Sequence, residues 1–497
     1  AKAGVAAPQL FAAIAAETSA RVAEFNAQEL ANVAWAFAKA GVAAPDLFSA
    51  VAQQAAPRVR DFTPKELAQS AWAFAKANAS APLFFQAIAA DVSSERRLTT
   101  FNAQDVSNTA WAFATAGVAA PQLFRCIADD VSRSGLLAHF KAQELSNVAW
   151  AFATAEARED VFFAAVAAEA APRLRDFTSQ GLANTAWAFA TAAVDAPHLF
   201  AAIAAEASRR LGDFDSQDLA TTAWAFAKLN VKAPHLFAAI AADIATRGLG
   251  EFRAQELSCA AWAFAKLNVD APQLYAAIAA ETSRRGLRAF NARSMANTAW
   301  AFATANVATP QLFGAIAAEA SSRLGDYDAR GLANTAWAFA TADLVAPQFF
   351  AAIAAEIAVR RRDECSAQAM ANVAWAFAKA NVAAPQLFAA IAAEAPTRLA
   401  EFTPQELAAA AWAFAKAESR AAPSLLRAIA ASGPTLGDFN AQNLAITAWA
   451  FSKAHVAAPQ LFRAIAAEAS PRLGEFNSQD LANTAWAFAK TTKSADR

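Results

Sequence analysis

The side chains that could do chemistry in this chain recur at fixed distances from thirteen tryptophans. Each tryptophan lies in the motif Ala-Trp-Ala-Phe-[Ala/Ser]-[Lys/Thr], and successive tryptophans are 37 to 39 residues apart. Amides can pair with base edges, cations neutralise phosphates, and aromatic rings stack on unpaired bases. The tryptophans are Trp35, Trp72, Trp111, Trp150, Trp187, Trp224, Trp262, Trp300, Trp337, Trp375, Trp412, Trp449 and Trp486.

Three polar rows accompany the tryptophans. The glutamine row stands seven residues before each one and comprises Gln28, Lys65, Gln104, Gln143, Gln180, Gln217, Gln255, Arg293, Arg330, Gln368, Gln405, Gln442 and Gln479. The asparagine row stands three residues before and comprises Asn32, Gln69, Asn108, Asn147, Asn184, Thr221, Cys259, Asn297, Asn334, Asn372, Ala409, Ile446 and Asn483. The lysine row stands four residues after and comprises Lys39, Lys76, Thr115, Thr154, Thr191, Lys228, Lys266, Thr304, Thr341, Lys379, Lys416, Lys453 and Lys490.

The charge of these rows is one-sided, although the chain as a whole has a net charge of −1. The 39 row positions hold 11 basic residues and no acidic one, in a chain with 43 carboxylates. A repeated stripe of cations, amides and rings is typical of modular RNA-binding proteins in which each repeat contacts about one base. The rows therefore predict binding of single-stranded RNA.

Each row could instead have a purely structural role. Asparagine and glutamine can form ladders between adjacent helices or satisfy backbone groups, as buried amides usually do. Tryptophan repeated thirteen times is more often packing than a ligand platform. Lysine in the last turn of a helix stabilises the helix dipole by a few tenths of a kcal/mol. The alternation of lysine and threonine is the feature that structural roles account for least well.

Two helices per repeat must position these residues. In the second repeat, Asn26 is a predicted N-cap, Glu29 completes a capping box, and the helix should run to about Ala40. Pro45 should then start a second helix, since its missing N–H is not needed there. On the first helix, the tryptophan and the three rows share one face, opposite the leucine and phenylalanine that face the partner helix.

The whole chain repeats this unit. The fold class is therefore predicted as all-α, an α-solenoid of about 13 helix-turn-helix repeats of 37–39 residues, with the rows on its concave face. One array should cover residues 1–497, incomplete at the N-terminal side of its first repeat and without a separate catalytic domain. The second helices should begin near Pro8, Pro45, Pro82, Pro121, Asp160, Pro197, Pro234, Pro272, Pro310, Pro347, Pro385, Pro423 and Pro459.

Several functions are disfavoured by what the sequence lacks. No segment approaches the 18 apolar residues of a membrane span, so no membrane insertion is expected. The three cysteines match no metal or redox spacing and suggest core substitutions in a reducing compartment. The four histidines have no carboxylate or nucleophile at a useful spacing, and no phosphate-binding loop occurs. We predict no enzyme activity, no metal, no cofactor and no small-molecule substrate.

The repeat also resembles a known family. The string F-[NTS]-x-Q-[ED]-L-A-N-x-A-W-A-F-A, followed by A-P-x-L-F-x-A-I-A, is similar to the octotricopeptide repeat and the related heptatricopeptide repeat. This resemblance covers essentially the whole chain. It implies an organellar RNA-binding protein that supports transcript stability, processing or translation, with a plastid favoured over a mitochondrion. The targeting segment of such a protein is not present in this chain.

The resemblance leaves two functions open. The first is sequence-selective binding of single-stranded RNA along the concave face. The second is a scaffold role within an organellar ribonucleoprotein such as a ribosome, in which the array packs against other proteins. RNA binding needs the rows exposed and positive, whereas a scaffold could cover them with a partner.

Overall fold

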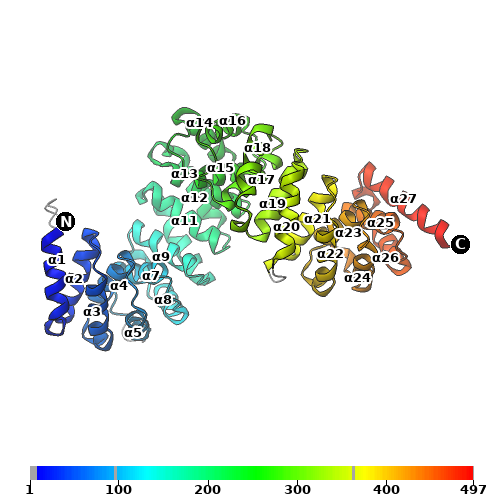
Figure 1. Cartoon of the computed structure of the whole chain (residues 1–497). Helices are drawn as coiled ribbons and strands as arrows, with labels where there is room; N and C mark the ends of the chain where they lie inside the picture. The colour runs from blue at the N-terminus through cyan, green and yellow to red at the C-terminus, as the bar shows by residue number, and fades with distance from the viewer. Residues whose placement is uncertain (1–7, 94–97, 361–363, 496–497) are drawn as a thin grey trace. The chain divides into compact units, whose positions relative to one another are not determined.

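The computed structural model describes residues 8–93, 98–360 and 364–495, and within them every regular element is helical. Two α-helices alternate along the chain, as predicted for an α-solenoid (Figure 1). The first helices carry the tryptophans and are α2 (Ala27–Ala40), α4 (Pro64–Lys76), α7 (Ala103–Thr115), α9 (Ala142–Thr154), α11 (Ser179–Thr191), α13 (Ser216–Lys228), α15 (Ala254–Lys266), α17 (Ala292–Thr304), α19 (Ala329–Thr341), α21 (Ala367–Lys379), α23 (Pro404–Lys416), α25 (Ala441–Lys453) and α27 (Ser478–Ala495).

The second helices alternate with them. They are α1 (Pro8–Ala20), α3 (Pro45–Ala55), α5 (Pro82–Val92), α8 (Pro121–Ser134), α10 (Asp160–Ala170), α12 (Pro197–Arg209), α14 (Pro234–Arg247), α16 (Pro272–Arg285), α18 (Pro310–Ser321), α20 (Pro347–Val359), α22 (Pro385–Glu394), α24 (Ala422–Ala431) and α26 (Pro459–Ala469). All begin where predicted, except that α24 begins one residue before Pro423. The chain forms two compact units, Ala1–Thr246 and Arg247–Arg497. The incomplete first helix predicted at the N-terminal side lies outside the described residues.

Side-chain caps begin the first helices. The Asn26 side chain accepts a hydrogen bond from the Glu29 N–H at 2.9 Å, and the Glu29 carboxylate accepts one from the Asn26 N–H at 2.9 Å. The predicted capping boxes of α4, α7 and α23 form in the same way. Each box satisfies two backbone donors that have no partner inside the helix. The capping pattern in the sequence therefore correctly located these helix starts.

The core interlocks consecutive repeats. Leu30 and Phe37 of α2 are buried, as are Leu47 and Phe48 of α3, which confirms the predicted apolar faces. The Phe48 ring packs edge-to-face on Phe74 of the next first helix, with the ring centroids 5.0 Å apart. The same pairing recurs along both units. Each repeat therefore completes its core with side chains of its neighbour, which is how a solenoid gains stability.

A residue with a left-handed backbone follows each first helix from α2 to α25. These turn residues stand six positions after the tryptophans and have positive φ angles; they are Gly41, Asn78, Gly117, Glu156, Ala193, Asn230, Asn268, Asn306, Asp343, Asn381, Glu418 and His455. Glycine tolerates this conformation best and asparagine, aspartate and histidine adopt it more readily than other types, so alanine and glutamate are strained in it. Five of the turn residues are asparagine, so the chain usually places a tolerant residue here.

Changing Ala193 to glycine is expected to stabilise the N-terminal unit by about 1 kcal/mol. Ala193 has φ 53°, where a Cβ atom is disfavoured, and glycine removes that strain. Urea unfolding followed by circular dichroism measures the gain. The neighbouring Ala192 has φ −70°, so Ala192→Gly is the matched control and should give no gain. Equal effects of the two variants would show that backbone strain at Ala193 is negligible.

Short 3-10 helices, absent from the sequence prediction, link many second helices to the next first helix. Arginines in these linkers, or just before them, form an arginine ladder. Arg323 donates to the backbone carbonyl of Phe290 at 3.0 Å and pairs with Glu319 and Asp326. Six arginines donate to a carbonyl 33 residues earlier, at 2.6 to 3.1 Å; they are Arg58, Arg173, Arg210, Arg285, Arg323 and Arg398. At these six places, charge-assisted hydrogen bonds tie a linker to the linker before it.

One repeat contains an apolar cavity where the others place a ring. Twelve repeats have phenylalanine or tyrosine ten residues before the tryptophan, but before Trp375 this residue is Cys365. A cavity of ≈ 240 Å³ lies there, lined by Cys365, Met370, Val373 and Leu387 among others. Burial raises the pKa of the Cys365 thiol. The predicted core substitution at this cysteine therefore leaves part of the core unfilled.

The Cys365→Phe variant is expected to be more stable than the natural chain by about 1–2 kcal/mol. A phenyl ring would enter the cavity and bury apolar area that the thiol leaves exposed. The midpoint of urea unfolding should increase. Cys365→Ser is the control and should not raise it, because a hydroxyl fills no more space than a thiol. A lower midpoint for the phenylalanine variant would mean that the cavity cannot take a ring.

Candidate nucleic-acid interface

The three rows lie on the face of the first helices that is opposite their buried leucines and phenylalanines. Every side chain of the glutamine row is exposed, including Lys65, Arg293 and Arg330. The asparagine row is half-buried, apart from the exposed Asn32. Most of the lysine row is exposed, while Lys453, Lys490, Thr154 and Thr341 are half-buried. The helix period thus brings the predicted site residues of each unit to one accessible face.

The tryptophans form a ladder along this face. Where ring pairs are described, consecutive indoles have centroids 6.1 to 6.4 Å apart and planes 29° to 38° from parallel. Eleven of the thirteen indoles are half-buried, and Trp35 and Trp486 are exposed by 38% and 41%. The rings therefore pack against one another and still present part of their surface to solvent. Packing and ligand contact, which the sequence offered as alternatives, are compatible here.

Most asparagines beside the ladder have no protein partner. Within the described residues, six half-buried amides make no hydrogen bond to another protein group; they are Asn108, Asn147, Asn184, Asn297, Asn334 and Asn372. Gln69 instead donates to Asn32 of the preceding repeat at 3.2 Å, and Gln479 donates to Asn483 at 3.0 Å. An amide ladder between repeats thus forms at Gln69. The other six amides keep their donors and acceptors available.

Pockets lie between consecutive first helices, and the indoles form part of their lining. One has a volume of ≈ 370 Å³ and is lined by Trp375, Trp412, Gln405 and Gln442 among others. The next, of ≈ 280 Å³, uses Trp337, Trp375, Gln368 and Asn372 in the same way. A pocket of ≈ 570 Å³ in the N-terminal unit is lined by Trp35, Lys39, Lys65, Gln69, Trp72, Asn102, Gln104, Asp105, Asn108 and Gln143. The repeat in the sequence therefore produces a repeated surface shape.

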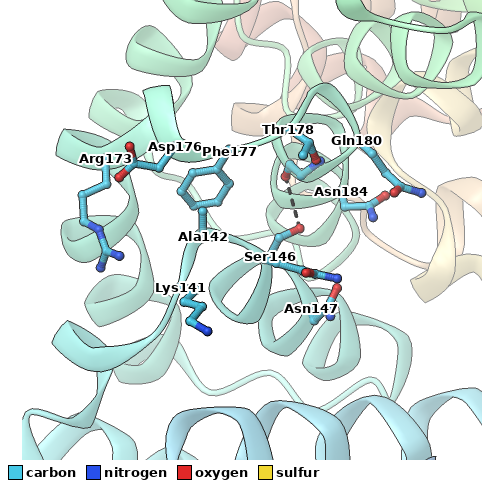
Figure 2. Close-up of a pocket in the computed structure, with 12 residues that line it drawn as sticks. Lys141, Ala142, Ser146, Asn147, Arg173, Asp176, Phe177, Thr178, Gln180 and Asn184 are labelled. Carbon is cyan, nitrogen blue, oxygen red and sulfur yellow. Dashed lines mark hydrogen bonds between the residues drawn. The ribbon is translucent and has the colours of Figure 1, made fainter. Parts of the chain in front are cut away.

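A further pocket of ≈ 520 Å³ lies between α9 and α11. Figure 2 shows Asn147, Gln180 and Asn184 toward one side of it and Lys141 and Arg173 toward the other. The Ser146 hydroxyl donates to the Gly181 carbonyl at 3.2 Å, which joins the two helices without using the amides. Cationic and amide groups therefore meet around one hollow.

The positive charge of the face is partly offset by acids that lie outside the three rows. Carboxylates in the first turn of the first helices, such as Asp105 and Asp218, are largely buried, and burial raises the pKa of both. Two turn residues contact the lysine row: Lys453 lies 2.9 Å from Glu418, and Lys379 lies 3.7 Å from Asp343. These pairs join different repeats, about 35 residues apart. The row pattern alone did not reveal them.

The described residues contain neither a cluster of metal ligands nor a helix suited to crossing a membrane. Among the described side chains, no group of three or more His, Cys, Asp or Glu could hold a metal ion. Of the helices in the described ranges, none combines the length and apolarity that crossing a bilayer requires. The three cysteines are unpaired and part-buried.

Comparisons with known proteins give one family. The family described as RNA-editing substrate-binding complex 6 protein matches residues 1–100, 87–355 and 290–492. No curated protein matches the chain. A chain of a homology model of the full-length AP-3 complex in an intermediate open conformation aligns over 97% of this chain and 92% of its own length. Its identity is 10% and its TM-score 0.25, too low to bear on fold or function.

The family match agrees with the RNA association expected from the rows, and it does not select between octotricopeptide and heptatricopeptide repeats. Its matched ranges together span nearly all residues from 1 to 492. The chain is an RNA-associated helical-repeat protein and belongs to the RNA-editing substrate-binding complex 6 protein family.

Proposed function

We propose that this protein binds single-stranded RNA along the three rows and the tryptophan ladder, with base preference set repeat by repeat. One observation supports this most directly: six half-buried asparagines have no protein partner and lie beside partly exposed indoles. A half-buried amide without a protein partner keeps its donor and acceptor groups available to a ligand. RNA bases supply both donors and acceptors.

The spacing of the ladder favours a single strand. The indoles are 6.1 to 6.4 Å apart, whereas each strand of a duplex advances by about 3.4 Å per nucleotide. Only an unstacked, extended strand can place one base at each repeat. Its bases would contact the indoles, its base edges the asparagine and glutamine rows, and its phosphates the lysine row.

Selectivity should follow the asparagine row. Repeats with asparagine can distinguish bases by hydrogen bonding, as amides do in other nucleic-acid interfaces. Cys259, Ala409 and Ile446 replace the amide in three repeats and cannot do so. We expect base preference to be weakest at these repeats.

A scaffold role is a second proposal, and exposed apolar residues on the second helices favour it. Leu83 and Val161 are exposed by 73% and 74%, at a helix position where most other repeats have a polar residue. Val359, at the end of α20, is exposed by 79%. Such side chains suit contact with a protein partner in a ribonucleoprotein. This surface is separate from the three rows, so both roles can coexist.

The remaining parts of the proposal rest on the sequence. We propose that the chain acts by binding and has no catalytic role, no cofactor and no small-molecule substrate. An organellar location is proposed from the repeat resemblance, and the preference for a plastid stays a prediction. Transcript stability, processing and translation are the proposed outcomes of binding.

Direct binding tests the proposal. The purified chain is titrated into a random single-stranded RNA pool, over a series of KCl concentrations, with double-stranded RNA of equal length as the control. We expect tighter binding to the single strand and an affinity that falls as salt rises. Sequencing of the bound pool should show a base preference. Equal affinity for the two RNAs would contradict the single-strand proposal, and no binding to either would favour the scaffold.

A further inference from the structure

Two lysines of the C-terminal unit are paired with carboxylates from the preceding repeat. The Lys453 ammonium donates to the Glu418 carboxylate at 2.9 Å, and Lys379 lies 3.7 Å from Asp343. Both acids are turn residues, six positions after Trp412 and Trp337. The hydrogen bond from Lys453 lowers the pKa of the Glu418 carboxyl. Each of these two lysines is therefore already paired with a carboxylate of the same chain.

Other lysines follow turn residues without charge. The turn residue of the preceding repeat is Gly41 for Lys76 and Asn381 for Lys416. Among the residues with described positions, the ion pairs of the lysine row are those of Lys379 and Lys453. The row therefore contains two classes of lysine, and only one class has its cation available to a phosphate.

The backbone does not explain the acid at Glu418. Its φ is 50°, a conformation that asparagine and glycine adopt more readily than glutamate. Asn381 supports the same turn one repeat earlier, so a neutral residue is sufficient for the fold. The glutamate costs conformational energy that an asparagine would largely avoid.

We propose that Asp343 and Glu418 act as internal competitors for RNA phosphate at Lys379 and Lys453. A phosphate that approaches these lysines must displace a carboxylate, so its net attraction is smaller than at Lys76. The two acids thereby weaken backbone contact at defined repeats and concentrate phosphate binding elsewhere. This inference rests on the proposed RNA binding and specifies which lysines carry it.

The double variant Asp343→Asn, Glu418→Asn tests the inference. Asparagine keeps the turn, because five repeats already use it, and frees both lysines. We expect affinity for single-stranded RNA at about 0.1 M KCl to rise roughly 5-fold per freed lysine. The plot of log affinity against log salt should steepen by about 0.7 per lysine. Circular dichroism and the unfolding midpoint confirm that the variant is folded.

Glu156→Asn is the matched control. Glu156 is also an acidic turn residue, but the next repeat has Thr191 in the lysine row. Its replacement changes the net charge by one without freeing a lysine, so affinity and salt slope should stay unchanged. An increase of about half that of the double variant, which removes two charges, would reveal a general charge effect and overturn the inference.

The outcomes separate the inference from the proposed function. If the natural chain binds RNA and the double variant binds with the same affinity and slope, the competitor role is wrong and RNA binding stands. If the natural chain binds no single-stranded RNA, the proposed function itself fails. Introducing an acid in the repeat before Lys416 with Asn381→Asp should lower affinity, and no loss there would also overturn the inference.

Discussion

Replacing Lys39, Lys65, Lys76 and Lys416 by alanine is expected to lower affinity for single-stranded RNA roughly 100- to 1,000-fold at about 0.1 M salt. Within the described residues, the ion pairs of lysines in the three rows are those of Lys379 and Lys453, so none of these four lysines forms one, and all four are exposed. Each should neutralise one phosphate and release its counterions. The salt dependence should become shallower by about 3 units of slope, which fluorescence anisotropy over a KCl series measures.

The matched control removes the same charge from the other helices. It changes four exposed arginines of the second helices to alanine, namely Arg125, Arg133, Arg427 and Arg463. We expect at most a small change in affinity, because these side chains lie away from the three rows. A lysine variant that binds RNA like the natural chain would rule out the rows as the RNA site and leave the scaffold proposal.

Replacing Trp337 and Trp375 by leucine is expected to weaken RNA binding roughly 100-fold. Stacking on an aromatic ring contributes about 1–3 kcal/mol per base, and these two indoles line the same pocket as Gln368 and Asn372. The salt slope should not change, because a stacking contact releases no counterions. This constant slope distinguishes the tryptophan variant from the lysine variant in the same titration.

The tryptophan variant needs a control for stability, since its indoles also pack on each other. Phe313 lies in the core, with its ring centroid 4.8 Å from that of Phe339. Phe313→Leu removes an aromatic contact between repeats without touching the RNA face. It should lower the unfolding midpoint and leave RNA affinity unchanged. If the tryptophan variant is no weaker in binding than this control, the ladder serves packing alone.

The sequence was sufficient for helix positions because the signals are local. Asn26 and Glu29 mark a helix start within four residues, and Pro45 marks the next. The helix period then assigned Leu30 and Phe37 to the core and the rows to the opposite face. These inferences need no knowledge of the neighbouring repeat.

The sequence pattern could not predict the contacts between repeats. The arginines of the ladder donate to backbone carbonyls, which every residue has. The residue type at the acceptor of Arg323 therefore could not reveal this hydrogen bond. Glu418 and Lys453 are 35 residues apart, and their meeting depends on how two helices stack. The cavity at Cys365 depends on whether neighbouring side chains move into the missing ring's space. Each of these features required three-dimensional positions.

The arginine ladder also affects how the array would respond to a pulling force. Each arginine tethers its linker to the previous one, so extension of the C-terminal unit must break a charge-assisted hydrogen bond at Arg323 or Arg398. At the corresponding place before Trp449 the chain has Thr435, which cannot supply that tether. Arg472, at the same place before Trp486, pairs with Glu468 and Glu475 and has no described bond to a carbonyl of the linker before it. We expect these two junctions to yield first under tension, and single-molecule stretching would locate them. RNA drawn taut by other machinery would then strain the array there before anywhere else in that unit.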